Sequence, residues 1–379
     1  MDDSGFCALA TLLIVPLLGG CSSTLAGESG AGNESYATQT GASDPGVDRA
    51  VAGDPPLPPA NAPSPGSASA AELPANLARE SDVRAPAPVL NDTTGGQEPG
   101  ADEAPAVDCT SLPAASDYGA PGPFADARMF SNVGPGNGFT LFRPDASLGT
   151  NGMRHPIATW GNGISTTPDQ YQKTLSLIAS HGFVIIACND TQAERPCLSA
   201  GLDWLVEQNG TTGELQGKLD ITRELTIGYS WGGGAAIDTA DRPNVKATVS
   251  LHGMPPRGAA AFADMHAPLL LFTSTGDSFV TAQQYVTPNF QSSQVQTFYG
   301  TLADSGAGHL YVVDEGAAVC IGAILGLGAC QTAAAEQAPT IAWLRYWACG
   351  DESARRYFFG ADCTLCSPPW AAPQRKQFP

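Results

Sequence analysis

The stretch Thr226-Ile227-Gly228-Tyr229-Ser230-Trp231-Gly232-Gly233-Gly234 decides the expected fold of this 379-residue chain. An apolar run ends at Gly228 and predicts a buried strand, and the small residues that follow Gly233 predict a helix. Gly228-x-Ser230-x-Gly232 matches the G-x-S-x-G nucleophile elbow, a sharp turn that presents the serine Oγ above a sheet. A glycine-rich turn with a chance serine is the alternative, but the flanking strand and helix favour the elbow.

Strands and helices alternate on both sides of this turn. The best-marked helix starts at Thr167, where Pro168 suits the first helical position and Gln170 completes a capping box. Further helices are expected from the spacing of Leu198, Leu202 and Leu205 and over 337–348. Strands are expected at 139–144, which we predict to be antiparallel, and at 155–160, 183–187, 225–228, 245–251, 269–273 and 295–299. Such alternation predicts an α/β fold, a mostly parallel sheet with helices on both faces.

A serine nucleophile needs an acid and a base, which follow it in the order Ser, Asp/Glu, His in this kind of fold. The strand at 269–273 leads directly to Asp277, so this carboxylate is expected at the sheet edge where sites form. A turn or helix-capping aspartate is the alternative interpretation. Asp304 and Asp314 are weaker candidates, because neither directly follows a core strand.

Five histidines compete for the role of base. His309 lies in a glycine-rich loop after the last predicted parallel strand, and it is the predicted base. His252 also follows a strand, but it precedes Asp277 and so violates the expected order. The other three, His155, His181 and His266, occupy ordinary structural positions at the ends of strands and helices.

An ester-cleaving serine also needs two backbone amides that point at the developing oxyanion. The amide of Trp231, directly after the serine, is the first candidate. The second is the amide of Asn162 in the Gly161-Asn162-Gly163 loop, for which a plain glycine-rich turn is the alternative. The large ring of Trp231 is also expected to contact the substrate.

Residues 1–21 have the features of an export signal. The apolar stretch 6–18 is too short to span a membrane, and Leu18-Gly19-Gly20-Cys21 resembles a bacterial lipoprotein signal in which the cysteine is lipidated. The acidic start, Met1-Asp2-Asp3-Ser4, departs from the usual positive charge of such signals. A misplaced start codon is one explanation of this departure. A buried helix with an incidental cysteine is the alternative to the signal. We expect a lipid-anchored envelope protein or a secreted one.

Residues 22–108 form an acidic tether. This segment is rich in Ala, Gly, Pro and Ser, contains Tyr36 as its only aromatic residue, and carries 13 acidic residues against 3 arginines. It cannot bury enough apolar surface to offset the entropy of ordering, so we expect disorder. Most of the net charge of −19 therefore lies outside the catalytic domain expected at 109–379, and no basic face for nucleic acid is predicted.

Eight cysteines remain in the expected catalytic domain. An even number in an exported domain predicts up to four disulfides, and close spacing favours Cys188–Cys197 and Cys320–Cys330. Cys349, Cys363 and Cys366 offer the alternative of a zinc site, but no nearby histidine completes a ligand set. We expect no metal and no cofactor.

Several motifs together resemble the bacterial cutinase and poly(ethylene terephthalate) hydrolase branch of the α/β-hydrolases, which is related to dienelactone-hydrolase-like esterases. They are Ser180-His181-Gly182-Phe183-Val184, the Gly228–Gly234 elbow, Gly276-Asp277 and Gly308-His309. The resemblance covers about 139–366. It implies an α/β-hydrolase fold in which Ser230 is the nucleophile, Asp277 the acid and His309 the base. It also implies the Asn162 and Trp231 amides as oxyanion donors.

The chain departs from that family at positions near the substrate. Asn162 stands where polyesterases carry an aromatic residue, and Trp231 replaces a methionine or glutamine. Met254 stands where the family places a tryptophan that clamps the acyl group. Asn162, Trp231 and Met254 are therefore the predicted substrate contacts, and these departures leave polyester cleavage open.

We expect a monomeric, exported serine carboxylic ester hydrolase that works through an acyl-enzyme and acts on an ester substrate. A carbohydrate-acetyl or lipid esterase is the alternative enzyme, and a surface lipoprotein that uses the scaffold only for binding is the alternative outside enzymes. The intact Ser, Asp and His in the expected order favour an enzyme.

Overall fold

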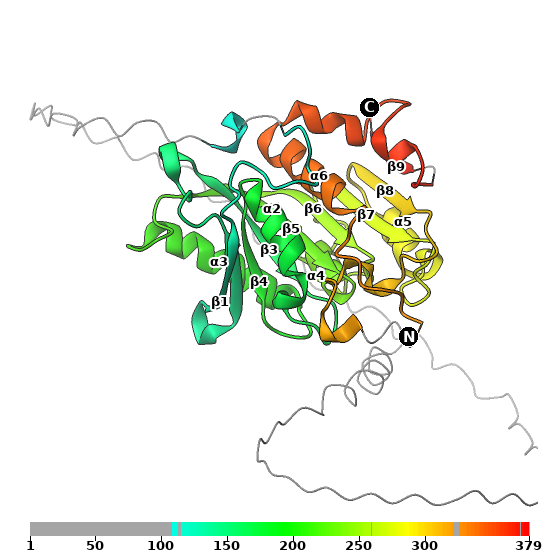
Figure 1. Ribbon diagram of the computed structural model, residues 1–379, viewed down its shortest axis with the longest axis horizontal. Helices are drawn as coiled ribbons and strands as arrows, with labels where there is room; N and C mark the ends of the chain where they lie inside the picture. The colour runs from blue at the N-terminus through cyan, green and yellow to red at the C-terminus, as the bar shows by residue number, and fades with distance from the viewer. Residues whose placement is uncertain (1–107, 113–114, 259, 321–325, 372, 379) are drawn as a thin grey trace, which may run out of the picture. The chain divides into compact units, whose positions relative to one another are not determined.

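The computed structural model describes residues 108–378 apart from 113–114, 259, 321–325 and 372. The expected signal and Cys21, and almost all of the expected tether, lie outside the described residues. Among the described residues, nine strands form one sheet in the order β1-β2-β4-β3-β5-β6-β7-β8-β9 (Figure 1). Their bounds are β1 Arg128–Val133, β2 Phe139–Arg143, β3 His155–Gly161, β4 Val184–Cys188, β5 Leu219–Tyr229, β6 Val245–Leu251, β7 Leu269–Ser274, β8 Thr297–Leu302 and β9 Gln374–Lys376.

The sheet is parallel from β4 to β8, and its antiparallel pairs lie at the two edges. β2 pairs antiparallel with β1 and β4, and β9 pairs antiparallel with β8. The expected mostly parallel α/β sheet is therefore confirmed, and so is the early antiparallel strand. Because the carboxyl ends of parallel strands share one edge, the loops after β3, β5, β6, β7 and β8 meet there.

The longer helices are α2 Gln172–Ser180, α3 Arg195–Gly210, α4 Trp231–Asp238, α5 Thr287–Ser292 and α6 Gln337–Cys349. Short helical turns lie between the larger elements. They are η1 Cys109–Ser111, η2 Pro135–Asn137, η3 Thr150–Gly152, η4 Pro168–Tyr171, η5 Ala282–Val286, η6 His309–Val312, η8 Glu352–Tyr357 and η9 Thr364–Cys366.

Helices cover both faces of the sheet. Alternate residues of each strand face opposite sides, so each strand contributes side chains to both cores. In β4, Ile185 and Ala187 pack in the core with α2 and α6, whereas Val184 and Ile186 pack with α3. In the same way, Leu270 of β7 lies in the core that contains α6, whereas Leu271 packs with Ile237 of α4.

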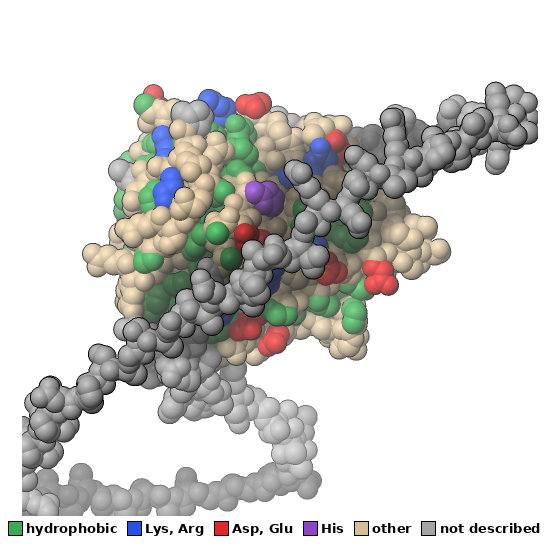
Figure 2. All heavy atoms as spheres, turned by 180° about the vertical axis from the view of Figure 1, so that it is seen from behind, with side chains coloured by type: hydrophobic (Ala, Val, Ile, Leu, Met, Phe, Trp, Pro, Cys, Tyr) green, Lys and Arg blue, Asp and Glu red, His purple; other side chains and the backbone are tan. Residues whose placement is uncertain are grey.

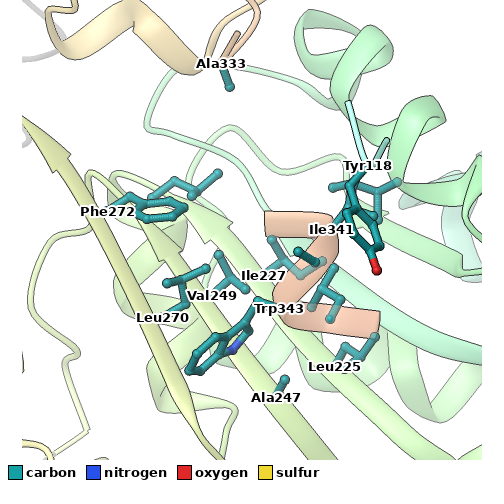
Figure 3. Close-up of a cluster of buried hydrophobic side chains, with 14 of the residues drawn as sticks. Tyr118, Leu225, Ile227, Ala247, Val249, Leu270, Phe272, Ala333, Ile341 and Trp343 are labelled. Atoms are coloured by element: carbon teal, nitrogen blue, oxygen red, sulfur yellow. The ribbon is translucent and has the colours of Figure 1, made fainter. Parts of the chain in front are cut away.

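Helix α6 closes the first of these cores. Figure 3 shows Ile341 and Trp343 of α6 lying over Ile227 of β5 and Val249 of β6. All four side chains are fully buried. Burial of a large apolar side chain contributes roughly 1.5–3 kcal/mol, so this contact anchors the C-terminal part of the chain to the middle of the sheet.

The start of α2 follows the predicted capping box. The backbone amide of Thr167 donates to Gln170 Oε1 at 2.9 Å, and Pro168 occupies the first turn. The first turn is the 3₁₀ turn η4, from which α2 continues. Leu175 and Ile178 are fully buried, as the helical spacing predicts.

The structure adds elements that the apolar pattern does not mark. β1 is half exposed and β9 is a polar three-residue edge strand, so neither has a run of buried residues. β8 begins at Thr297, two residues later than expected, where it pairs with Leu269 of β7. The elbow strand is longer than the expected 225–228, since β5 starts at Leu219.

Four disulfides join the described cysteines in pairs. Two are the pairs that spacing favours, Cys188–Cys197 and Cys320–Cys330. The others are Cys109–Cys349, which ties η1 to the end of α6, and Cys363–Cys366. The three cysteines considered for zinc are thus all in disulfides.

The surface of the described part of the chain is mixed in character. On the face drawn in Figure 2, acidic and basic side chains lie scattered among neutral and apolar ones where described residues are visible. Within the described ranges, no helix combines the length and the apolar content needed to cross a membrane.

Candidate active site

Ser230 occupies a strained turn between β5 and α4. Its φ is 53° and its ψ is −118°. A positive φ of this kind is rarely adopted by residues other than glycine. Three backbone amides hold the turn by donating to the Ser230 carbonyl, those of Gly233 at 3.0 Å, Gly234 at 3.4 Å and Met254 at 2.9 Å. Backbone strain of this kind persists only where the surroundings enforce it, and it is concentrated at functional sites.

The elbow requires glycine because three backbones meet there. A Cβ on Gly228 would lie 2.0 Å from the carbonyl oxygen of Gly232. A Cβ on Gly232 would lie 2.1 Å from the carbonyl oxygen of Gly161, at the end of β3. The close approach of α4 to β5 and β3 therefore sets the position of Ser230 and of the Asn162 loop together.

The sheet edge brings Ser230, His309 and Asp277 into one hydrogen-bonded chain. His309 Nε2 lies 2.9 Å from Ser230 Oγ, and His309 Nδ1 lies 2.8 Å from Asp277 Oδ2. Ser230 is 3% exposed and His309 is 6% exposed. With Nδ1–H donating to the carboxylate, Nε2 is left as the acceptor that faces the serine hydroxyl.

Neighbouring groups fix the two partners of the serine. The Asp277 carboxylate accepts through Oδ1 from the backbone amides of Phe279, at 3.0 Å, and Val280, at 2.8 Å. His309 begins η6, and its carbonyl accepts a hydrogen bond from the Tyr229 hydroxyl. The Phe279 ring packs on the His309 imidazole with 5.0 Å between the ring centroids.

The Asn162 side chain is fixed inside the protein. Its Nδ2 donates to the carbonyl of Cys188 at 2.6 Å, and its Oδ1 accepts from Trp160 Nε1 at 3.0 Å. Its own carbonyl accepts from the Gly232 amide at 3.0 Å, so the Asn162 backbone lies against the first turn of α4. The arrangement keeps the predicted amide donors of Asn162 and Trp231 on adjacent backbones, but the Asn162 side chain is engaged and is not free for a substrate.

The Trp231 ring, which the sequence predicts to contact the substrate, is covered in the structure. The residue is only 5% exposed, and the Arg257 guanidinium lies 3.6 Å from the ring centroid. This distance suits a cation–π interaction, which explains why the ring is not left open. Met254 is half buried beside the elbow, and its carbonyl accepts from Asn289 Nδ2 at 3.2 Å.

A second histidine reaches the same carboxylate. His252 directly follows β6, and its Nδ1 lies 2.8 Å from Asp277 Oδ2. Its Nε2 lies 3.0 Å from Oε1 of Glu336, the residue before α6. Burial alone would lower the pKa of His252, but the Glu336 and Asp277 carboxylates outweigh it and raise that pKa to about 10.

The two imidazoles also act on Asp277. Burial alone would raise the pKa of the Asp277 carboxyl, but the charge of His309 and the hydrogen bonds from His252 and His309 hold it well below its usual range. Asp277 is therefore ionised throughout the neutral range. This buried chain, Glu336–His252–Asp277–His309–Ser230, is called the charge array below.

Three members of the charge array also form the one cluster among the described residues that is close enough to hold a metal ion. They are His252, Asp277 and His309. Both imidazole nitrogens lie 2.8 Å from the same oxygen, which is the length of a charge-assisted hydrogen bond, so direct hydrogen bonding already accounts for the cluster.

The sequence analysis assigned no role in the site to two members of the charge array, His252 and Glu336. His252 lies directly after a core strand, which is a signal for the sheet edge, and it does not contact the serine, in keeping with its exclusion as the base. Glu336 gives no local signal, because it lies 84 residues from His252 in an unremarkable stretch before α6.

Comparison with known proteins identifies one family. The family model of PET hydrolase-like proteins matches residues 112–363 of the chain. A search of curated proteins found no match.

Replacement of Gly232 by alanine tests the backbone constraint at the elbow. Because the new methyl group would overlap the Gly161 carbonyl, we expect Gly232→Ala to lower the free energy of unfolding by about 3 kcal/mol, the upper end for overpacking. Gly210→Ala is the matched control, since a methyl group there meets nothing within 4 Å. Urea unfolding measures both, and equal stability of the two variants would contradict the account.

The raised pKa of His252 makes stability depend on pH. The unfolded chain releases the His252 proton near pH 6.5, whereas the folded chain holds it to about 10. Its stabilising contribution is therefore complete below pH 6.5 and lost as the pH rises to 10. We expect the melting temperature to fall over this interval, and to fall less steeply in His252→Asn. Identical slopes for the two proteins would show that His252 carries no extra proton.

Proposed function

The chain belongs to the PET hydrolase-like family, and from this premise we propose that it is an exported serine ester hydrolase whose nucleophile is Ser230. The family makes it an ester hydrolase of the α/β-hydrolase type. The observation that supports the specific mechanism is the unbroken chain of short contacts from Ser230 Oγ through His309 to Asp277. His309 acts as general base and Asp277 as its orienting acid.

The acylation step follows from this geometry. Ser230 Oγ attacks the ester carbonyl carbon while its proton passes to His309 Nε2. The carbonyl oxygen becomes an oxyanion, for which the amides of Asn162 and Trp231 are the proposed donors. Asp277 stabilises the imidazolium that forms on His309. Collapse of the tetrahedral intermediate breaks the ester C–O bond, the alcohol leaves with the proton from His309, and Ser230 carries the acyl group.

Hydrolysis of the acyl-enzyme reverses these roles with water. His309 takes a proton from water, the hydroxide attacks the acyl carbon, and the acid leaves as Ser230 recovers its proton. Neither step requires a metal or a cofactor in its atom balance, since water supplies the second nucleophile.

We propose that the substrates are soluble esters of short to medium acyl length. Between β6 and β7, the described residues form turns rather than a helical lid. The Trp231 ring is covered by Arg257, and Met254 replaces the tryptophan expected of polyesterases. We therefore propose a cutinase-like carboxylesterase and leave a carbohydrate-acetyl or lipid esterase as the alternative.

Export is proposed from the cysteines and the N-terminal sequence. Disulfides persist in oxidising compartments, and the described residues contain four. Within this proposal, residues 1–21 act as the signal with Cys21 as the lipidation site, and 22–108 act as the tether of a catalytic domain at 109–379.

Loss of the Ser230 hydroxyl tests the proposed function. We expect Ser230→Ala to lower kcat on an activated soluble ester by at least about 1,000-fold, because the nucleophile is removed, while the melting temperature stays close to wild type. Initial rates on p-nitrophenyl acetate and butyrate measure the change. Ser292→Ala, on the last residue of α5, is the control and should retain full activity.

Two results would contradict the proposal. A Ser230→Ala variant with a tenth of wild-type turnover would exclude Ser230 as the nucleophile. A wild-type protein that hydrolyses neither soluble esters nor polyester films would favour the binding lipoprotein.

A further inference from the structure

His252 and Glu336 form the part of the charge array that the proposed mechanism does not use. Both side chains are fully buried, and each ring nitrogen of His252 faces a carboxylate oxygen, that of Asp277 at 2.8 Å and that of Glu336 at 3.0 Å. The remaining oxygen of the Glu336 carboxylate, Oε2, has no hydrogen-bond partner in the described part of the chain.

Charge balance decides the protonation of His252. A buried carboxylate is costly unless a positive charge or a hydrogen-bond donor compensates it. A neutral imidazole has one N–H and could serve only one of its two carboxylate partners. An imidazolium donates from both nitrogens and balances one of the two negative charges, so this arrangement favours the charged ring.

We propose that His252, held by Glu336, is a positioning residue that is protonated in the neutral range, fixes Asp277 and opposes protonation of the His309 base through its charge. This inference rests on the proposed function and extends it, because it assigns a purpose to two residues that touch neither the serine nor a substrate.

The first effect is geometric. Asp277 Oδ2 accepts from His252 and His309, both at 2.8 Å, while Oδ1 accepts from two backbone amides. These four donors come from the loop after β6, from η6 and from the loop after β7. The carboxylate cannot rotate without breaking several of them, so His309 meets an oxygen in a fixed place.

The second effect is electrostatic. The His252 and His309 ring centroids are 6.3 Å apart, so a charge on His252 opposes protonation of His309. Glu336 binds the opposite ring nitrogen and offsets only part of this repulsion. The charge on His252 is thus placed to act on the imidazole that accepts the serine proton.

The other titratable groups packed against His252 stay neutral. Tyr229, at the end of β5, and Tyr311, in η6, both have rings within 6.5 Å of the His252 ring. Burial raises the pKa of both hydroxyls, that of Tyr311 to about 12. The local charge is thus set by Asp277, Glu336 and the two imidazoles.

Nitrogen NMR of the full chain, with ¹⁵N-labelled histidine, tests the charge on His252 without an activity assay. We expect one buried ring with both nitrogens protonated at pH 8.5, a signal that is absent from His252→Asn/Glu336→Gln. Asparagine suits this site because His252 has a φ of 46°, which asparagine tolerates. In Glu336→Gln alone, that ring should lose its second proton at least one pH unit lower. A wild-type spectrum with only neutral buried rings at pH 8.5 would overturn the proposal.

The pH profile of kcat/KM tests the effect on His309. In His252→Asn/Glu336→Gln, we expect the pH of half-maximal kcat/KM to rise, because the positive charge beside His309 is removed. We also expect kcat at the plateau to fall roughly 10-fold with KM changed less than twofold, because the defect lies in positioning. An unchanged half-maximal pH in a folded variant would reduce His252 to a structural residue and contradict the proposal.

His155→Asn is the matched control. His155 is equally buried but lies at the start of β3, the end of that strand away from Ser230. Its loss should lower stability and leave the pH profile unchanged. The readouts also separate this proposal from the proposed function, since an active Ser230→Ala variant would refute the mechanism while the NMR result still decides the charge on His252.

Discussion

The close packing of three backbones at the elbow is the constraint on which the site depends. Gly228, Gly232 and Gly161 leave no room for a side chain, so α4 leaves the sheet at one fixed angle. That angle forces Ser230 into its strained conformation and brings the Asn162 loop against the first turn of α4. The order of strands positions the other site residues, because β3, β6, β7 and β8 all end at the same edge of the sheet. Residues that are far apart in sequence thereby meet above β5.

Burial gives this arrangement its electrostatic character. Asp277 and Glu336 are carboxylates shielded from water, and buried charges without partners would destabilise the fold by several kcal/mol each. His252 lies between them and bonds to both. The same hydrogen bonds that make the buried charges tolerable also fix the orientation of Asp277. Stability and positioning are therefore supplied by one set of contacts, and both depend on the state of a single imidazole.

Sequence patterns predicted the parts of this site that are local. The elbow is visible because glycine spacing and a flanking apolar strand lie within a few residues of Ser230. Asp277 and His309 were predicted because each follows a core strand, and in the structure His309 bonds to both Ser230 and Asp277. Glu336 could not be found, since its partner lies 84 residues away and nothing near it in the sequence marks a buried acid. The covering of Trp231 by Arg257 was missed for a similar reason, because a ring's exposure depends on tertiary contacts.

Covalent labelling tests the central claim most directly. A fluorophosphonate reacts with a serine only where a base activates it and the oxyanion is stabilised. Intact-mass analysis followed by peptide mapping should show a single adduct per chain, on the peptide that contains Ser230, and no adduct in His309→Ala. An unlabelled wild-type protein, or an adduct on a different serine, would contradict the account.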